Sequence, residues 1–172
     1  MIKNVLCEIR PATVTITDRQ ELLNRLQAIG KTHKTHIICF DADKMAGRRH
    51  VLAALRHALR SREAGTMISN SFEMEALLFA AGSRQCSIAS SFGFHEGENR
   101  LWVCCCPESP QVWQDLFGVL KFVAGDWTNR TPEQVAQLRE LFGITDEELE
   151  AAGADRLDDL ILERTSLLEV NR

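Results

Sequence analysis

Two short runs of consecutive apolar residues constrain the fold of this chain most strongly. Residues 37–40 read "IICF" and residues 101–106 read "LWVCCC". A strand that is buried on both faces has a continuous apolar run, whereas a half-buried strand alternates apolar and polar residues. The sequence therefore predicts two buried strands, over about 36–41 and 100–106.

The other predicted elements do not alternate regularly between strand and helix. A further strand is expected over about 3–10, interrupted by Pro11, and "TVTI" continues it as a second short strand. Asn70 and Glu73 match a capping box at the start of a helix. Apolar periodicity and end signals predict helices over about 19–29, 47–63, 70–81, 84–92, 110–124, 132–142, 146–152 and 156–170. We predict an α+β fold, with a small mixed or antiparallel sheet of about four or five strands and helices packed mainly on one side.

The chain length suits one domain, which we expect to span residues 1–172 with an acidic helical part from about residue 132. No apolar run reaches the roughly 18 residues of a membrane span, and the first residues lack the long apolar region of a signal peptide. We therefore expect a cytoplasmic protein that does not associate with a membrane.

Charge is distributed unevenly along the chain. Residues 1–100 carry 14 Lys and Arg against 10 Asp and Glu, whereas residues 101–172 carry 6 against 14. A basic half and an acidic half suggest two surfaces with different partners. An uneven distribution of charged residues over ordinary solvent-exposed faces explains the same numbers, so charge alone leaves both interpretations open.

Six cysteines raise the question of a metal or redox site. Three of them are consecutive, Cys104, Cys105 and Cys106, so Cys105 faces away from the other two in a strand. The sequence has no C-x-x-C pair and no histidine at finger spacing from a cysteine pair. We interpret the cysteines as buried, reduced and apolar.

Signs of catalysis are weak. Asp41 and Asp43, followed by Lys44, could hold a cation or act as an acid and base, although D-x-D before a helix is also ordinary capping. His50 and His57 lie about 10 Å apart along a helix, too far to share a metal ion. We therefore expect no catalytic residue, no cofactor and no metal, and keep a small metal-dependent enzyme that uses Asp41, Asp43 and Lys44 as the alternative.

The segment Gly82-Ser83-Arg84-Gln85 separates two apolar runs. If Gly82 ends one helix and Ser83 caps the next, Arg84 and Gln85 fall in the first turn of a helix, where an arginine opposes the helix dipole. That position suits an anion site, with Gln85 adding a donor and an acceptor. An ion pair from Arg84 to Glu73 or Glu75, with Gln85 in solvent, explains the segment equally well.

Three longer stretches carry a family resemblance. They are "FDADKMAGRRHVLAALRHAL", "ISNSFEMEALLFAAGSRQ" and "FGFHEGENRLWVC", and "ERTSLLEV" near the end of the chain continues the similarity. Together they resemble the kinase-binding small subunit of the KEOPS complex, the family of the animal TPRKB protein. The resemblance runs from about residue 37 to about 106 and resumes in the last helix. Cys86 stands where the family usually has an aliphatic residue.

The resemblance implies a non-catalytic subunit of the machinery that makes threonylcarbamoyladenosine in tRNA. Members bind and stimulate the small atypical kinase of the complex, and contact its other subunits indirectly. Archaeal members are understood to bind the single-stranded 3′ CCA end of tRNA. On this reading, the expected RNA-binding residues are the basic and amide side chains of three segments: Lys44, Arg49, His50, Arg56, Arg60, Asn70, Arg84 and Gln85.

Overall fold

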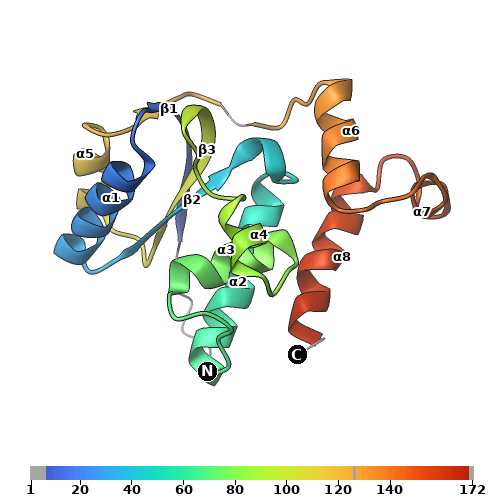
Figure 1. The fold of residues 1–172 in the computed structure, drawn as a ribbon, viewed down its shortest axis with the longest axis horizontal. Helices are drawn as coiled ribbons and strands as arrows, with labels where there is room; N and C mark the ends of the chain where they lie inside the picture. Colours follow the sequence, from blue (N-terminus) through green and yellow to red (C-terminus); the bar gives the residue numbers. More distant parts are fainter. Residues whose placement is uncertain (1–6, 126, 171–172) are drawn as a thin grey trace. The chain divides into compact units, whose positions relative to one another are not determined.

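A computed structural model describes residues 7–125 and 127–170 of the chain (Figure 1). The described residues form two compact units. Unit 1 comprises residues 7–41 and 93–125, and unit 2 comprises residues 42–92 and 127–170.

Unit 1 is built on a four-stranded antiparallel sheet with the order β2-β3-β1-β4. The strands are β1 (Glu8–Ile16), β2 (His36–Asp41), β3 (Gly97–Cys106) and β4 (Lys121–Phe122). The two continuous apolar runs lie in β2 and β3, which are hydrogen-bonded neighbours. The predicted buried strands and the α+β class are therefore confirmed.

Helices α1 (Arg19–His33) and α5 (Pro110–Leu116) cover one face of this sheet (Figure 1). Asp18 caps α1 by accepting a hydrogen bond from the backbone N–H of Glu21. The buried core of this layer combines alternate strand residues, the inner faces of the two helices and two loop residues: Ala12, Ile16, Leu22, Leu26, Ile37, Cys39, Phe94, Leu101, Val103, Cys105, Val112, Trp113, Leu116 and Leu120.

Two expectations for unit 1 are wrong at element ends. Pro11 does not break the first strand. Its carbonyl accepts a hydrogen bond from the Val123 N–H at the end of β4, and the strand needs no N–H donor from residue 11 at this point. The predicted helix over 110–124 stops at Leu116, and Gly118 lies in a turn that leads into β4. Glycine has a low helix propensity, so Gly118 favours an end to the helix. Residues 121–122 then form their backbone hydrogen bonds with the open edge of β1 instead of within a longer helix. Residues 3–6 of the first predicted strand lie outside the described residues.

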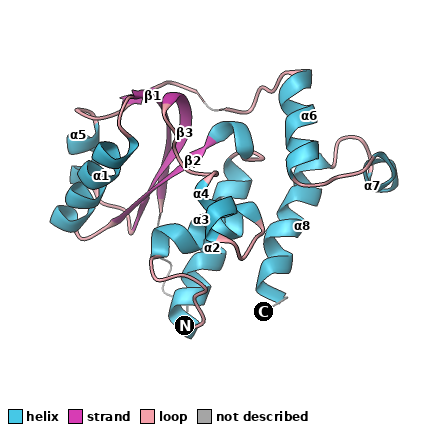
Figure 2. Cartoon of the chain, in the orientation of Figure 1, coloured by secondary structure: helices cyan, strands magenta, loops and turns pink. Residues whose placement is uncertain are grey.

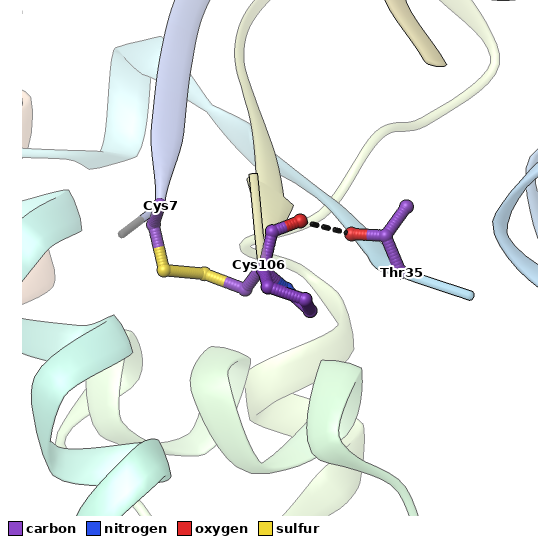
Figure 3. Close-up of a disulfide and its surroundings, with 4 residues drawn as sticks. Cys7, Thr35 and Cys106 are labelled. Carbon is purple, nitrogen blue, oxygen red and sulfur yellow. Dashed lines mark hydrogen bonds between the residues drawn. A yellow bond between two sulfur atoms is a disulfide. The ribbon is translucent and has the colours of Figure 1, made fainter. Parts of the chain in front are cut away.

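The expectation that all cysteines are reduced is also wrong, because Cys7 and Cys106 form a disulfide (Figure 3). The antiparallel register of β1 and β3 places residue 7 opposite residue 106, a pairing that a separation of 99 residues hides in the sequence. Cys105 points to the opposite face, where burial raises its pKa and that of Cys39 to about 12. These two thiols behave as apolar core residues, as predicted.

Unit 2 is helical apart from its loops (Figure 2). Its elements are a 3₁₀ turn η1 (Ala42–Lys44) and helices α2 (Arg48–Ala64), α3 (Phe72–Ala81), α4 (Cys86–Ser90), α6 (Pro132–Leu141), α7 (Asp146–Ala152) and α8 (Leu157–Val170). All six predicted helices of this unit exist, although α4 is shorter than expected. Among the residues that the structure describes, no helix is long and apolar enough to cross a membrane.

Candidate functional site

The turn between α3 and α4 begins at Gly82, which ends α3 as predicted. Gly82 has a φ of 61°, a left-handed conformation that glycine adopts without strain. A Cβ atom at this position would lie 3.2 Å from the carbonyl oxygen of Arg164 in α8. Glycine is therefore required here both by backbone conformation and by the close approach of another helix.

Arg84 and Gln85 lie before α4 rather than in its first turn, so that expectation is wrong. The Ser83 hydroxyl accepts a hydrogen bond from the Gln85 N–H, and Gln85 itself is the N-cap residue of a helix of five residues. Such a short helix is no basis for an anion site at its N-terminus. What the turn does provide is exposure, because each of the five residues 84–88 is solvent-exposed.

Cys86 and Ile88 do not anchor this turn in the core. Cys86 is exposed and 43% of the Ile88 surface is exposed, whereas Ala89 is the buried residue of α4. Positions two residues apart lie about 200° apart around a helix axis, so Cys86 and Ile88 cannot both face one core. The turn therefore presents guanidinium, amide, thiol and aliphatic groups together to solvent.

Glu75, one of the two expected partners of Arg84, has another task. This residue is fully buried, and its carboxylate accepts hydrogen bonds from the backbone N–H groups of Ile68 and Ser69 at 2.9–3.1 Å. The hydroxyls of Ser61 and Ser69 donate to it at 2.9 and 3.1 Å. Glu75 thus fixes the loop that joins α2 to α3.

This loop also decides which residue caps α3. The cap is Ser71, whose hydroxyl accepts from the Met74 N–H, so the predicted capping box of Asn70 and Glu73 is wrong. Asn70 is exposed one position earlier. The ten residues of α3 span about 15 Å, so Asn70 and Arg84 stand at opposite ends of that helix.

The basic face of α2 is partly neutralised by α8. Arg49 donates to Asp159 at 3.3 Å, and Arg60 lies 3.6 Å from Glu169. Hydrogen bonds from Arg156 and Arg49 lower the pKa of Asp159, which keeps that carboxylate ionised. Arg49 and Arg60 therefore contribute less positive surface than the sequence suggests, while Arg56 on the same helix is exposed.

His50, predicted to contact RNA, cannot do so because it is fully buried. Its Nδ1 accepts a hydrogen bond from the Ala46 N–H at 3.0 Å, so Nε2 carries the proton and donates to the Ala80 carbonyl at 2.9 Å. His57 is also buried, against Glu169 and the ring of Phe79. Both histidines tie α2 to neighbouring segments of unit 2.

The buried environment of His50 predicts a pH dependence of stability. Burial lowers its pKa from 6.5 to about 4, although the Ala80 carbonyl favours the charged form. Between these values the unfolded chain binds a proton that the native chain excludes, so the free energy of unfolding falls with falling pH. This group alone should account for a loss of about 3 kcal/mol between pH 6.5 and 4.

Chemical denaturation of the wild type and of His50→Asn over this pH range measures the effect. The variant should lose less stability between pH 6.5 and 4 than the wild type, whatever its stability at neutral pH. Equal slopes for the two proteins would contradict this account of His50.

Lys44 lies near the end of α4. Its ammonium donates to the Ser91 carbonyl at 2.7 Å and is 5.8 Å from the centre of the Phe92 ring. Because α4 has only five residues, or about 7.5 Å, this cation and Arg84 lie at opposite ends of a short segment.

The residues of the alternative enzyme hypothesis have structural contacts of their own. Asp41 is buried at the end of β2, and its carboxylate is 3.7 Å from Nδ1 of His95 in the same unit. Within the described parts of the chain, no three histidine, cysteine or acidic side chains are grouped closely enough to hold a metal ion.

A second candidate surface is the outward face of α8, which the sequence analysis did not identify. The inward positions Leu157, Ile161, Thr165 and Leu168 are buried. Leu167 and Val170 point outward, with 43% and 76% of their surfaces exposed, and Glu163 is exposed beside them at helical spacing. The adjacent apolar pair Leu167 and Leu168 is no signal of this face, because neighbouring helix positions can both be buried, as Val112 and Trp113 are in α5.

Comparison with known proteins agrees with the resemblance seen in the sequence. The family described as kinase binding protein CGI-121 matches residues 14–169, which is nearly the whole chain. A search of the curated proteins with this chain finds no match. The match includes the turn after α3 and α8 up to residue 169. The chain therefore belongs to the CGI-121 family of kinase-binding proteins.

Proposed function

We propose that this chain is a non-catalytic, cytoplasmic subunit of the KEOPS complex that binds and stimulates the small atypical kinase and binds the 3′ CCA end of tRNA. The observation that carries the proposal is the family match over residues 14–169. The chain would thereby serve the synthesis of threonylcarbamoyladenosine in tRNA and reach the other subunits through the kinase.

The outward face of α8 is the proposed kinase-docking surface. Leu167 and Val170 are two of the few large apolar side chains that are exposed in the described residues. Apolar side chains at the centre of a patch, surrounded by polar residues, are typical of protein interfaces. Glu163 adds an exposed carboxylate to this face, which suits a partner with a basic residue beside its docking site, whereas the Glu169 carboxylate is taken up by His57 and Arg60 of α2.

The exposed segment 84–88, with Lys44 at the far end of α4, is the proposed contact for the CCA end. Arg84 supplies a guanidinium for a phosphate, Gln85 a donor and acceptor for a base edge, and Ile88 an apolar surface for a base. Arg56 and Asn70 are exposed and remain in the proposed surface at its periphery. Arg49 and Arg60 contribute weakly because α8 carboxylates neutralise them, and His50 is excluded by its burial.

The double variant Arg84→Ala, Gln85→Ala is expected to weaken tRNA binding about 10-fold or more, by loss of one phosphate contact and one base contact. Affinity should be measured in titrations at several salt concentrations, with intact tRNA and with tRNA lacking CCA. The slope of log affinity against log salt should fall by about one for the lost arginine.

Arg25→Ala is the matched control, because it removes an exposed arginine from α1 in unit 1. It should leave both tRNA affinity and the salt slope unchanged. Equal affinities of the wild type and the double variant, or equal affinities for intact and trimmed tRNA, would contradict the proposed contact.

Co-purification of the chain with the KEOPS kinase, followed by a gel shift with tRNA, tests the function as a whole. We expect a stable complex with the kinase and a faster ATP turnover by the kinase when the chain is present. Activity of the chain alone that depends on Mg²⁺ and is lost in Asp43→Asn would instead favour the alternative enzyme.

A further inference from the structure

The exposed turn before α4 contains a serine in a distinctive context. Ser87 has Arg84 three residues before it and Ile88 directly after it. All residues from Arg84 to Ile88 are solvent-exposed. An arginine at this spacing and an aliphatic residue after the acceptor are the features that basophilic serine/threonine kinases recognise by charge and shape.

A kinase must draw its acceptor segment into an extended conformation, so local stability matters as much as exposure. Helix α4 has five residues, no side-chain hydrogen bond at its N-cap, and only Ala89 buried. A helix this short is marginal by itself, and segments with few buried contacts open at low free-energy cost. Unwinding the backbone around Ser87 therefore exposes one buried side chain of this helix, Ala89.

Thr13 shows that an arginine three residues before a serine or threonine is not enough to make that residue accessible to a kinase. Among the serines and threonines of the whole sequence, only Thr13 and Ser87 have an arginine three residues before them. Thr13 lies inside β1, paired with Arg100 of β3 on one side and Lys121 of β4 on the other. Reaching it in extended form would require removal of a strand from the sheet, so the structure separates an accessible acceptor from an inaccessible one.

We infer that Ser87 is a phosphorylation site for a basophilic serine/threonine kinase that uses ATP. The Ser87 hydroxyl oxygen attacks the γ-phosphorus of ATP, and the bond from that phosphorus to the bridging oxygen of ADP breaks. ADP leaves, and the serine proton passes to the catalytic aspartate of the kinase. The product carries a phosphate of nearly two negative charges at neutral pH, three residues from Arg84.

The modification would also regulate the proposed tRNA contact, and this consequence rests on the proposed function. A phosphate beside Arg84 pairs with its guanidinium and repels the phosphates of RNA. Phosphorylation should therefore weaken tRNA binding, while kinase docking at α8 on another segment of unit 2 should be unchanged.

The test treats the folded full-length chain with a purified basophilic kinase that requires arginine at this spacing, and with ATP carrying a radioactive γ-phosphate. Mass spectrometry then locates the label. We expect one phosphate per chain, on Ser87, with Thr13 unlabelled. Ser87→Ala should abolish incorporation, and Arg84→Ala should lower the initial rate about 10-fold or more, whereas Gln85→Ala should not.

A peptide covering residues 81–93 serves as the reference for an unfolded acceptor. Labelling of the peptide but not of the folded chain would overturn the inference, because the fold would then block access. Labelling of neither, or persistent labelling of Ser87→Ala, would overturn it as well. Gel shifts of modified and unmodified chain separate the two proposals: if the unmodified chain fails to bind tRNA, the proposed function fails although Ser87 is modified.

Discussion

Replacement of Glu75 by alanine is expected to lower the free energy of unfolding by about 3 kcal/mol or more, because it removes one partner from a buried charged network. Two backbone N–H groups and two serine hydroxyls donate to this carboxylate. Without it, the donors of the partly buried loop after α2 lose their acceptor. A loss of this size should lower the melting temperature by roughly 6–12 °C in a chain of this length.

Thermal and chemical denaturation followed by circular dichroism measure this loss. Glu163→Ala is the matched control, since Glu163 is exposed on α8 and its removal should change stability by less than about 0.5 kcal/mol. A Glu75→Ala protein as stable as this control would show that the loop does not depend on the carboxylate.

The apolar runs of β2 and β3 and the helical periodicity of unit 2 could be read from the sequence because each signal is local. Long-range partners could not. The disulfide of Cys7 and Cys106 depends on a strand register, and β4 forms because the edge of β1 is open. In the loop before α3, three adjacent residues can each cap a helix, and burial of Glu75 decides among them.

The sequence indicated which residue types the candidate site contains, but not which other side chains would contact them in the fold. Arg84 and Gln85 are exposed, as a binding segment requires. The partners of Arg49 and Arg60 come from α8, about 110 residues later in the chain, so their neutralisation has no local signal. His50 looks like a surface residue of a basic helix, but contacts with Ala46 and Ala80 give it a structural role.

The double variant Leu167→Glu, Val170→Glu is expected to weaken binding of the KEOPS kinase about 100-fold or more. Two carboxylates buried against an apolar partner surface cost about 3 kcal/mol together, and such a cost corresponds to roughly that factor. The outer positions of α8 are exposed in the free chain, so the fold should tolerate the change with a loss of about 1 kcal/mol or less.

Ile88→Glu is the matched control for this variant. The side chain of Ile88 is exposed to the same extent as that of Leu167, 43%, but lies on α4 in the segment proposed for RNA. It should leave kinase affinity unchanged and weaken tRNA binding, whereas the α8 variant should do the reverse. Loss of both activities in both variants would mean that the two surfaces are not separate.

The central claim, that this chain is a kinase-binding subunit, is tested most directly by calorimetric titration of the purified full-length chain into the purified KEOPS kinase. The account predicts a saturable one-to-one complex with a submicromolar dissociation constant, on the order of 10⁻⁷ M, and its marked weakening by the α8 double variant. No heat of binding at micromolar concentrations, or equal binding by wild type and the α8 variant, would contradict it.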